Sequence, residues 1–388
     1  MTQNYNHEHY MALALELAEQ GRYTCDPNPM VGCVIVPGLP IIAPALGMEA
    51  AAGWLVTVPS LGVVLFGPLA AYIIHRYDMY TSLLAGLAAY GVFGVCGAFL
   101  ADSWLIFVDR LLLGGATALV MASGTGLISV FYEGKARMNM MARQGMAIEL
   151  GGVIMLSLGG ILAGISWYWP FALYLSAWLL FIMVLIFVPH PQTHNHGSAD
   201  SDSIRIPAAI RLLYFSALMA MVAFFSAIIL LPFKLHALGF SEAQTGYLLS
   251  FVSLIAVVAA GFMPKAVRGL GEYRTLVTAF VLYTCAHLAF AAAESLAALV
   301  AAAILLGAGF GLSIPLVNFM TVEQSHPQQR GRLLAFLSMA VFSGQFLSSF
   351  MDVFPQPLGL LAASALSCFS AVVIVITHRR IRARHAVS

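Results

Sequence analysis

Three ionisable residues, Asp109, Arg110 and Glu149, lie within or at the edge of long apolar stretches. A charged side chain inside lipid costs about 3 kcal/mol on insertion scales, so it normally faces an interior cavity or a partner. Glu149 could carry a proton, because removing a carboxylate from water favours its neutral form. Alternatively it is a static partner of Arg110 or Arg143. His287 could also titrate, but we expect it to make a satisfied polar contact.

The composition indicates a membrane protein. Of 388 residues, 61% are hydrophobic and only 9% are charged, whereas soluble domains carry roughly a quarter charged residues. Too few charges remain to cover a surface that faces water. The net charge of +1 gives no reason to expect nucleic acid as a partner. No C-x-x-C pair is present, and we predict neither a metal site nor a cofactor.

Apolar runs long enough to cross a bilayer predict the elements that position these residues. A spanning helix needs about 20 apolar residues. The chain contains twelve candidate spans, at 30–47, 51–74, 80–100, 103–132, 144–165, 168–188, 209–233, 243–263, 274–293, 295–320, 331–351 and 357–377. The sequence therefore predicts an all-α membrane protein of twelve transmembrane helices, arranged as two six-helix pseudo-repeat bundles.

The distribution of basic residues tests this count and gives an orientation. With twelve spans, 16 of the 18 Lys and Arg residues fall on one side, in the even loops and the two terminal segments. Short cytoplasmic loops collect Lys and Arg, so we expect both termini in the cytoplasm. Lys234 in an odd loop and Arg110 in a span are the exceptions. The odd loops carry mainly acids, including Glu49, Asp102 and Asp352.

A polar stretch from His190 to Pro207 divides the spans six and six, which is typical of a linker between halves. The halves also resemble each other: Leu112 to Ala116 and Leu305 to Gly309 match, each in the fourth span of its half. Repeated halves are a signature of secondary transporters, whose substrate site lies near the midplane between them. The predicted organisation is an N-terminal cytoplasmic segment 1–29, a first bundle 30–189, a linker 190–208, a second bundle 209–378 and a basic cytoplasmic tail 379–388.

Several short motifs stand at the starts, middles or ends of predicted spans: Gly53-Trp-Leu-Val-Thr-Val-Pro-Ser60, Arg110-Leu-Leu-Leu-Gly-Gly115, Ser166-Trp-Tyr-Trp-Pro-Phe171, Arg330-Gly-Arg332 and Gly344-Gln-Phe346. Together they resemble motifs of the major facilitator superfamily, in its drug and metabolite exporter branch, over about residues 37–380. The resemblance implies that Arg110, with Asp109 and Glu149, takes part in proton coupling. The alternative for Arg110 is a structural anchor that binds helix carbonyls.

The loop after the second span departs from the family pattern G-x-x-x-D-R-x-G-R-R. Only Arg76 fits, and Asp78 stands where the family has its second glycine. We expect Arg76, Asp78 and, in the equivalent loop of the second half, Arg268 to form a gating loop. The antiporter motif of the fifth span is also partial, because Met155 and Leu156 replace its Gly-Pro pair while three glycines match. This partial match favours export.

Small residues and isolated polar residues complete the predicted site. Glycines in the fourth and fifth spans would let helices approach closely: Gly114, Gly115, Gly151, Gly159 and Gly160. Polar or aromatic residues that could line a substrate cavity are Trp54, Tyr247, Asn318 and Gln345.

The N-terminal residues 11–36 resemble the opening helix and first strand of the riboflavin-pathway pyrimidine deaminase, most specifically over Asp26 to Val36. That family builds its zinc site from H-x-E and P-C-x-x-C signatures. Neither motif is present, so this fragment is predicted to be non-catalytic.

The leading hypothesis is a monomeric secondary active transporter in a bacterial inner membrane, which exports a small organic molecule in exchange for protons. Its predicted partners are the substrate, protons and the lipid bilayer. One alternative is uptake of a metabolite by proton symport. An alternative of another class is a deaminase of riboflavin synthesis anchored to the membrane, against which the missing zinc ligands argue.

Overall fold

The computed structural model of the chain describes residues 33–132, 134–190, 206–325 and 330–387, and these residues form helices and connecting turns without strands. The elements are η1 (Cys33–Ile35), α2 (Leu39–Ala45), η2 (Glu49–Ala51), α3 (Ala52–Tyr77), α4 (Met79–Cys96), η3 (Gly97–Phe99), α5 (Leu105–Phe131), α6 (Gly134–Ala163), η4 (Trp169–Leu175), α7 (Ser176–Phe187), α8 (Ala208–Ala237), α9 (Glu242–Leu270), α10 (Glu272–Ala292), α11 (Leu296–Glu323), α12 (Arg330–Leu347), η5 (Ser348–Val353) and α13 (Leu358–Val387).

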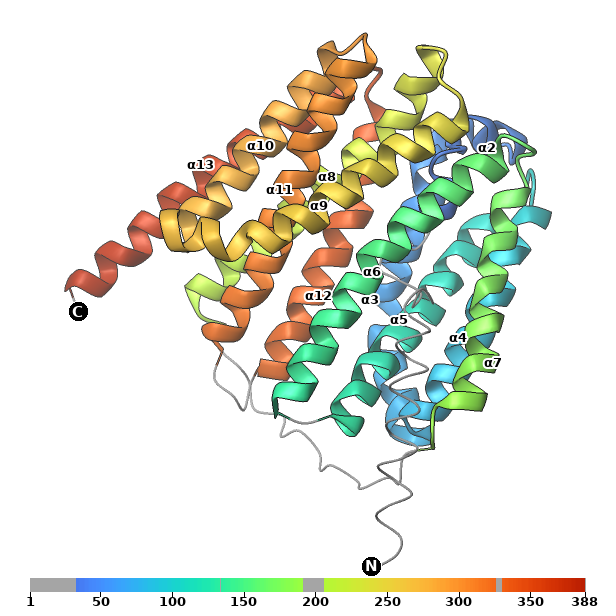
Figure 1. Ribbon diagram of the computed structural model, residues 1–388, viewed down its shortest axis with the longest axis horizontal. Coiled ribbons are helices and arrows are strands. Elements are labelled where there is room, and N and C mark those ends of the chain that lie inside the picture. Colours follow the sequence, from blue (N-terminus) through green and yellow to red (C-terminus); the bar gives the residue numbers. More distant parts are fainter. Residues whose placement is uncertain (1–32, 133, 191–205, 326–329, 388) are drawn as a thin grey trace, which may run out of the picture.

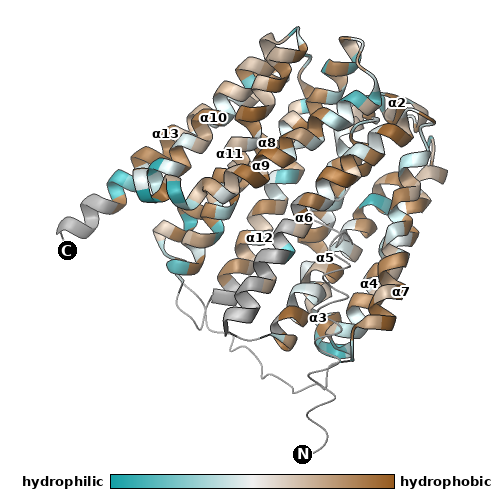
Figure 2. Cartoon of the chain, in the orientation of Figure 1, coloured by the Kyte–Doolittle hydropathy of each residue, from teal (hydrophilic) through white to brown (hydrophobic). Residues whose placement is uncertain are grey.

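These helices follow the predicted spans. Ten helical stretches in the described part are long and apolar enough to cross a membrane, and the apolar part of α6, Leu150–Ala163, forms a shorter one. Figure 2 shows hydrophobic residues along most of each helix and hydrophilic residues near the ends. The two helices that extend furthest beyond the predicted apolar runs are α6, which begins at Gly134, and α13, which continues to Val387. The predicted C-terminal tail is therefore helical as far as it is described. By a smaller margin, α9 continues past 263 to Leu270 and α8 past 233 to Ala237.

The first predicted span is described only from Cys33, as η1 and the seven-residue helix α2. Pro40 lies in the first turn of α2, where its missing N–H leaves no intrahelical bond unmade, and Pro44 lies inside it. The predicted segment 1–29 and residues 191–205 of the predicted linker lie outside the described residues.

The two halves repeat the same backbone turn at equivalent positions. Asp78, between α3 and α4, has φ 84° and ψ 166°, and Gly271, between α9 and α10, has φ 84° and ψ 160°. Both amides donate to the carbonyl four residues earlier. This backbone region is populated almost only by glycine, which explains why the family pattern has a glycine where this chain has Asp78.

Close glycine contacts within each half repeat as well. Gly114 on α5 packs against the Pro59 carbonyl of α3, and Gly307 on α11 packs against the Val252 carbonyl of α9. In both places a β-carbon would collide with the facing backbone. The matched positions confirm the two pseudo-repeat bundles that the sequence predicted.

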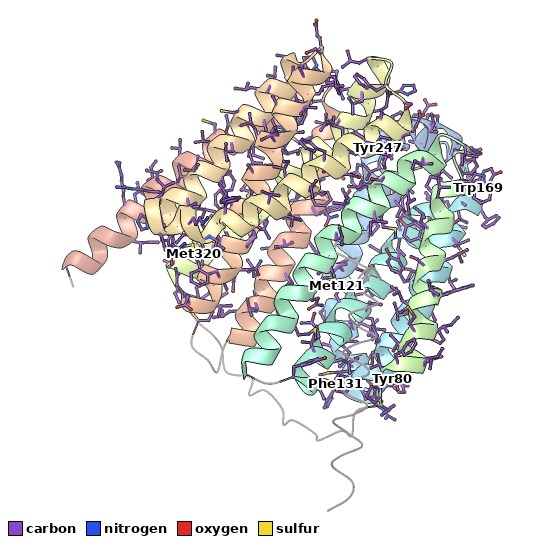
Figure 3. All side chains as sticks on the ribbon, in the orientation of Figure 1. Tyr80, Met121, Phe131, Trp169, Tyr247 and Met320 are labelled. Atoms are coloured by element: carbon purple, nitrogen blue, oxygen red, sulfur yellow. The ribbon has the colours of Figure 1, made fainter. Side chains whose placement is uncertain are left out.

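The helices of the two halves are close at one end of the molecule and separate toward the other. Figure 1 shows α6 and α9 side by side near α2, and diverging toward the end at which α7 ends and α8 begins. We call that end the linker end and the opposite one the far end. Aromatic residues lie near both ends of the first half: Trp169 at the far end, and Tyr80 and Phe131 at the linker end (Figure 3). Such aromatic residues favour membrane–water interfaces.

Candidate transport site

The first contact between the halves, which we call the polar seam, joins α3 to α12 and η5. The backbone N–H of Gly53 donates to Oδ2 of Asp352 at 3.1 Å, across 299 residues of sequence. One turn further along α3, the Thr57 hydroxyl is within hydrogen-bonding distance of the Ser349 hydroxyl. A β-carbon on Gly53 would lie 3.1 Å from Ile229 and 3.2 Å from Asp352, so glycine permits this close approach.

Aromatic residues lie directly beside these polar contacts. The Trp54 ring packs edge-on against Phe346 and Phe350, with centroid distances of 5.6 Å to each. Trp54 belongs to the first half, and Phe346 and Phe350 belong to the second, so these rings also join the halves.

Two buried polar side chains lie one turn closer to the middle of the membrane. Gln345 is fully buried, and neither its Nε2 nor its Oε1 has a hydrogen-bond partner among the described residues. The Ser60 hydroxyl is equally buried and also has no partner there. Because Gly53 faces Asp352 and Thr57 faces Ser349, the antiparallel register of α3 and α12 places Ser60 level with Gln345. Unpaired buried polar groups are costly, and they mark a place where a polar ligand or water gains hydrogen bonds.

The second contact between the halves, which we call the glycine seam, joins α6 to α9. A β-carbon on Gly246 would lie 2.6 Å from the Leu156 carbonyl oxygen and 3.2 Å from the α-carbon of Gly160. The Ser250 hydroxyl donates to the Val153 carbonyl at 2.9 Å and lies 2.8 Å from the Ser157 hydroxyl. The backbones therefore touch without intervening side chains.

Asp109 and Arg110 form an ion pair inside the first half. Nη2 of Arg110 lies 2.7 Å from Oδ2 of Asp109 and donates to the carbonyl oxygen of Phe93 at 2.8 Å. The guanidinium group also lies 5.6 Å from the ring centroids of Phe171 and Tyr174. Arg110 is fully buried, and its contacts tie α5 to α4 and η4, as expected of the structural alternative.

The other two titratable candidates lie elsewhere. Glu149 lies on α6, but its side chain is not among those that the structure describes. His287 on α10 is fully buried, and its Nε2 lies 2.9 Å from the Ala223 carbonyl of α8. One ring nitrogen of His287 therefore has the polar contact that we expected, whereas its buried Nδ1 has no hydrogen-bond partner among the described residues.

The four predicted cavity residues do not surround one cavity. Trp54 and Gln345 both belong to the polar seam. Asn318 is exposed near the linker end of α11, where its amide donates to the Ile314 carbonyl at 3.1 Å.

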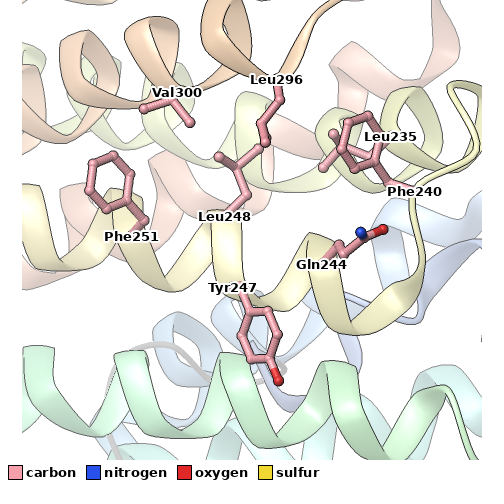
Figure 4. A pocket seen from close by; sticks show the side chains of 8 residues that line it. All are labelled: Leu235, Phe240, Gln244, Tyr247, Leu248, Phe251, Leu296 and Val300. Atoms are coloured by element: carbon pink, nitrogen blue, oxygen red, sulfur yellow. The ribbon is translucent and has the colours of Figure 1, made fainter.

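Tyr247 is 53% exposed and lines a separate pocket of about 270 Å³ at the far end of the second half. Figure 4 shows its ring pointing toward α6. The pocket is otherwise lined by Leu235, Phe240, Gln244, Leu248, Phe251, Leu296 and Val300.

At the linker end, the predicted gating residues make local contacts. The Asp78 carboxylate caps α4 by accepting from the Thr81 amide at 2.8 Å. The Arg76 guanidinium lies 5.5 Å from the ring centroid of its neighbour Tyr77. Arg268 is in the last turn of α9, in the other half. Within the described part of the chain, no hydrogen bond or ion pair joins these residues across the halves.

The predicted glycines serve two different contacts. Gly114 and Gly115 face α3, and Gly159 faces the Val34 carbonyl of η1, so these three pack within the first half. Gly160 instead faces Glu242 and Gly246 of α9, in the glycine seam. Gly151 is buried on α6.

Sequence reasoning missed four residues of the polar seam: Ser60, Thr57, Ser349 and Asp352. Asp352 was expected to be an ordinary acid of an odd loop. Its partner lies almost 300 residues away, and a single sequence carries no signal that pairs two positions so far apart.

Comparison with known proteins agrees with this architecture. A family model described as Major Facilitator Superfamily matches residues 30–349. The chain is 27% identical over 247 residues to the 2-nitroimidazole transporter of Escherichia coli, and this match spans 61% of each protein. It is 24% identical over 301 residues, 74% of each, to the class B tetracycline resistance protein of Escherichia coli.

Solved structures share the fold at lower identity. The inward-open xylose transporter of E. coli superimposes with a TM-score of 0.70, at 14% identity, over 94% of this chain and 95% of that one. A bacterial homologue of the lysosomal transporter Spinster, in an inward-facing and occupied conformation, gives 0.71 at 14% identity over 98% of both chains.

A 29-residue stretch is 69% identical to the riboflavin biosynthesis protein RibD of Escherichia coli and covers only 8% of either chain. The predicted resemblance to the deaminase is confirmed as a short fragment. The fold and the long matches are those of transporters rather than enzymes. The chain belongs to the major facilitator superfamily of membrane transporters.

Proposed function

We propose that this protein exports a small organic molecule across the bacterial inner membrane in exchange for protons, by alternating access between halves 30–189 and 209–378. The observation that carries the proposal is the position of the two seams. Both lie toward the far end, while α6 and α9 diverge toward the linker end. Two halves that touch at one end only can rock about a site between them, so that the site is open first to one side of the membrane and then to the other.

The charge distribution supports an orientation. Basic residues gather at the linker end of the predicted spans, which by the positive-inside rule is cytoplasmic. The described arrangement is then inward-facing, with the far end closed toward the outside.

Gln345 and Ser60 are the best-supported substrate contacts. They are buried, unpartnered and on opposite halves, just inside the aromatic contacts of Trp54. The Gln345 amide and the Ser60 hydroxyl can hydrogen-bond to one donor and one acceptor of an uncharged polar group on the substrate. The neighbouring aromatic rings would pack against an apolar or aromatic part of the same molecule. Relatives named for 2-nitroimidazole and tetracycline provide the first compounds to test.

Glu149 remains the proposed proton carrier, because a carboxylate taken into the membrane is most easily accommodated in its neutral form. Proton uptake at Glu149 and substrate binding near Gln345 would then favour opposite orientations of the halves. Arg110 and Asp109 support this cycle indirectly, by holding α4, α5 and η4 together.

A thermal-shift screen of the detergent-solubilised protein against 2-nitroimidazole, tetracycline and a metabolite library identifies a ligand, because a ligand that binds the folded state raises its melting temperature. Counterflow in proteoliposomes under an imposed pH gradient then gives the direction. Glu149→Gln is expected to abolish uphill movement of that ligand and leave the melting temperature unchanged. The control is Glu323→Gln, an exposed carboxylate at the end of α11. Unchanged proton-driven flux in Glu149→Gln would refute the role of Glu149. If counterflow shows the ligand moving inward together with protons, the protein is an uptake symporter and the proposal of export is wrong.

A further inference from the structure

Asp352 joins the two halves through the start of a helix. It lies in η5, at the far end of α12, and it accepts the N–H of Gly53, the second residue of α3. The first N–H groups of a helix have no intrahelical partner and carry a partial positive charge, which attracts an anion. The carboxylate of one half therefore binds the positive end of a helix in the other half.

Among the described residues, Asp352 forms no salt bridge, so no cation neutralises its carboxylate there. Four helices pack against η5, namely α3, α8, α12 and α13. At the far end, their ionisable groups are Lys234 and His236 of α8, with Glu49 just before α3. Lys234 donates to the Ala291 carbonyl at 2.9 Å, and His236 lies 3.6 Å from Glu242. Charged residues of α12 and α13 lie toward their linker ends.

Protonation of Asp352 therefore changes the charge of the polar seam itself. The ionised carboxylate makes a charge-assisted hydrogen bond to Gly53, which is roughly twice as strong as a neutral one. A carboxyl group that has gained a proton on one oxygen keeps at most a neutral hydrogen bond and loses its attraction to the helix terminus. No other bond needs to form or break.

We propose that Asp352 is a proton-binding site that controls the far end: while ionised it holds the halves together through Gly53, and when protonated it releases them. That the far end faces the outside rests on the proposed function. The expected pH response of the far end does not depend on that function. The ratio of open to closed far ends should change roughly twofold to thirtyfold on protonation, the range that corresponds to the interaction of a charge with a helix terminus.

The test measures the distance between spin labels at Ala101→Cys and Ala237→Cys, two exposed positions at the far ends of the two halves. The five native cysteines are replaced by serine, and spectra are recorded in lipid nanodiscs between pH 8 and pH 5, without substrate. Acidification should increase the population with the longer distance. Asp352→Asn, which keeps the shape and a carbonyl acceptor, should show the longer distance at every pH.

Asp102→Asn is the matched control, because Asp102 is an exposed carboxylate at the same end and its loss should leave the pH response intact. Asp352→Ser, a small hydroxyl that can still accept from Gly53, repeats the test should the asparagine variant fold poorly. A pH response that persists in Asp352→Asn or Asp352→Ser, or that is absent from the parent protein, overturns the proposal. Since the measurement needs neither substrate nor gradient, a failed export assay leaves this result standing.

Discussion

Gly246→Ala should open the far end without unfolding either half. The new β-carbon would lie 2.6 Å from the Leu156 carbonyl oxygen, whereas ordinary van der Waals contact begins at 3.4 Å. The backbones of α6 and α9 must therefore separate by about 0.8 Å. Overpacking of this kind costs about 1–3 kcal/mol. At about 1.4 kcal/mol for each factor of ten, the open-to-closed ratio should rise roughly fivefold to 150-fold.

This free energy should appear as a change of conformation, because α6 and α9 belong to different halves. They can separate at the far end while the contacts within each half remain. The label pair at Ala101 and Ala237 should report a larger population at the longer distance. A second pair, at the exposed Tyr77 and Leu270 near the linker end, should move to shorter distances, since rocking halves close one end as they open the other.

Gly261→Ala is the matched control on the same helix, because a β-carbon there would meet nothing within 4 Å. Replacing this glycine within a helix should stabilise α9 slightly, by up to about 1 kcal/mol, without a change in either distance. Identical distance distributions for Gly246→Ala and Gly261→Ala would refute the reasoning, because the close approach of Gly246 to α6 would then not hold the far end closed.

Three further predictions concern the stability of single halves, each measured as a melting temperature together with the far-end distance. Gly114→Ala should lower stability by about 1–3 kcal/mol without opening the far end, because its β-carbon would collide with the Pro59 carbonyl of the same half. Gly271→Ala should cost about 1–3 kcal/mol through its φ of 84°, whereas Gly269→Ala, with open space around it, should not. Arg110→Ala should lower stability by about 3–5 kcal/mol, because it leaves a buried carboxylate without its cation; a melting temperature equal to that of the parent would exclude a structural anchor.

Hydropathy predicted the transmembrane helices well and their ends less well. Apolar runs detect the part of a helix that lies in lipid, so the ten-residue stretch from Gly134 to Arg143, which contains three basic residues, was not recognised as the start of α6. The same reasoning ended the last span at 377, although α13 continues to Val387. The internal repeat was visible as short matches, and its physical basis became clear from the shared turn at Asp78 and Gly271.

The site was less predictable because it consists of contacts between distant segments. Asp109 and Arg110 are neighbours in sequence, and their pairing could be expected. Trp54 and Gln345 were recognised as isolated polar or aromatic residues, but nothing in their own segments placed them in the same seam. Asp352 was classed with the loop acids because hydropathy gives no information on which helix faces a carboxylate.

The two seams occupy equivalent places in the repeat but differ in chemistry. The glycine seam joins the fifth and eighth spans, and the polar seam joins the second and eleventh. The glycine seam is held by close backbone packing and neutral serine hydroxyls, whose energies do not depend on pH in the physiological range. The polar seam contains a carboxylate bound to a helix terminus, and beside it an amide and a hydroxyl without partners. In the proposed cycle both seams must separate when the far end opens, and the glycine seam contributes a contact energy that does not change with pH. The proposed protonation of Asp352 and binding of substrate near Gln345 would instead act on the polar seam, which offers a carboxylate and polar groups without hydrogen-bond partners.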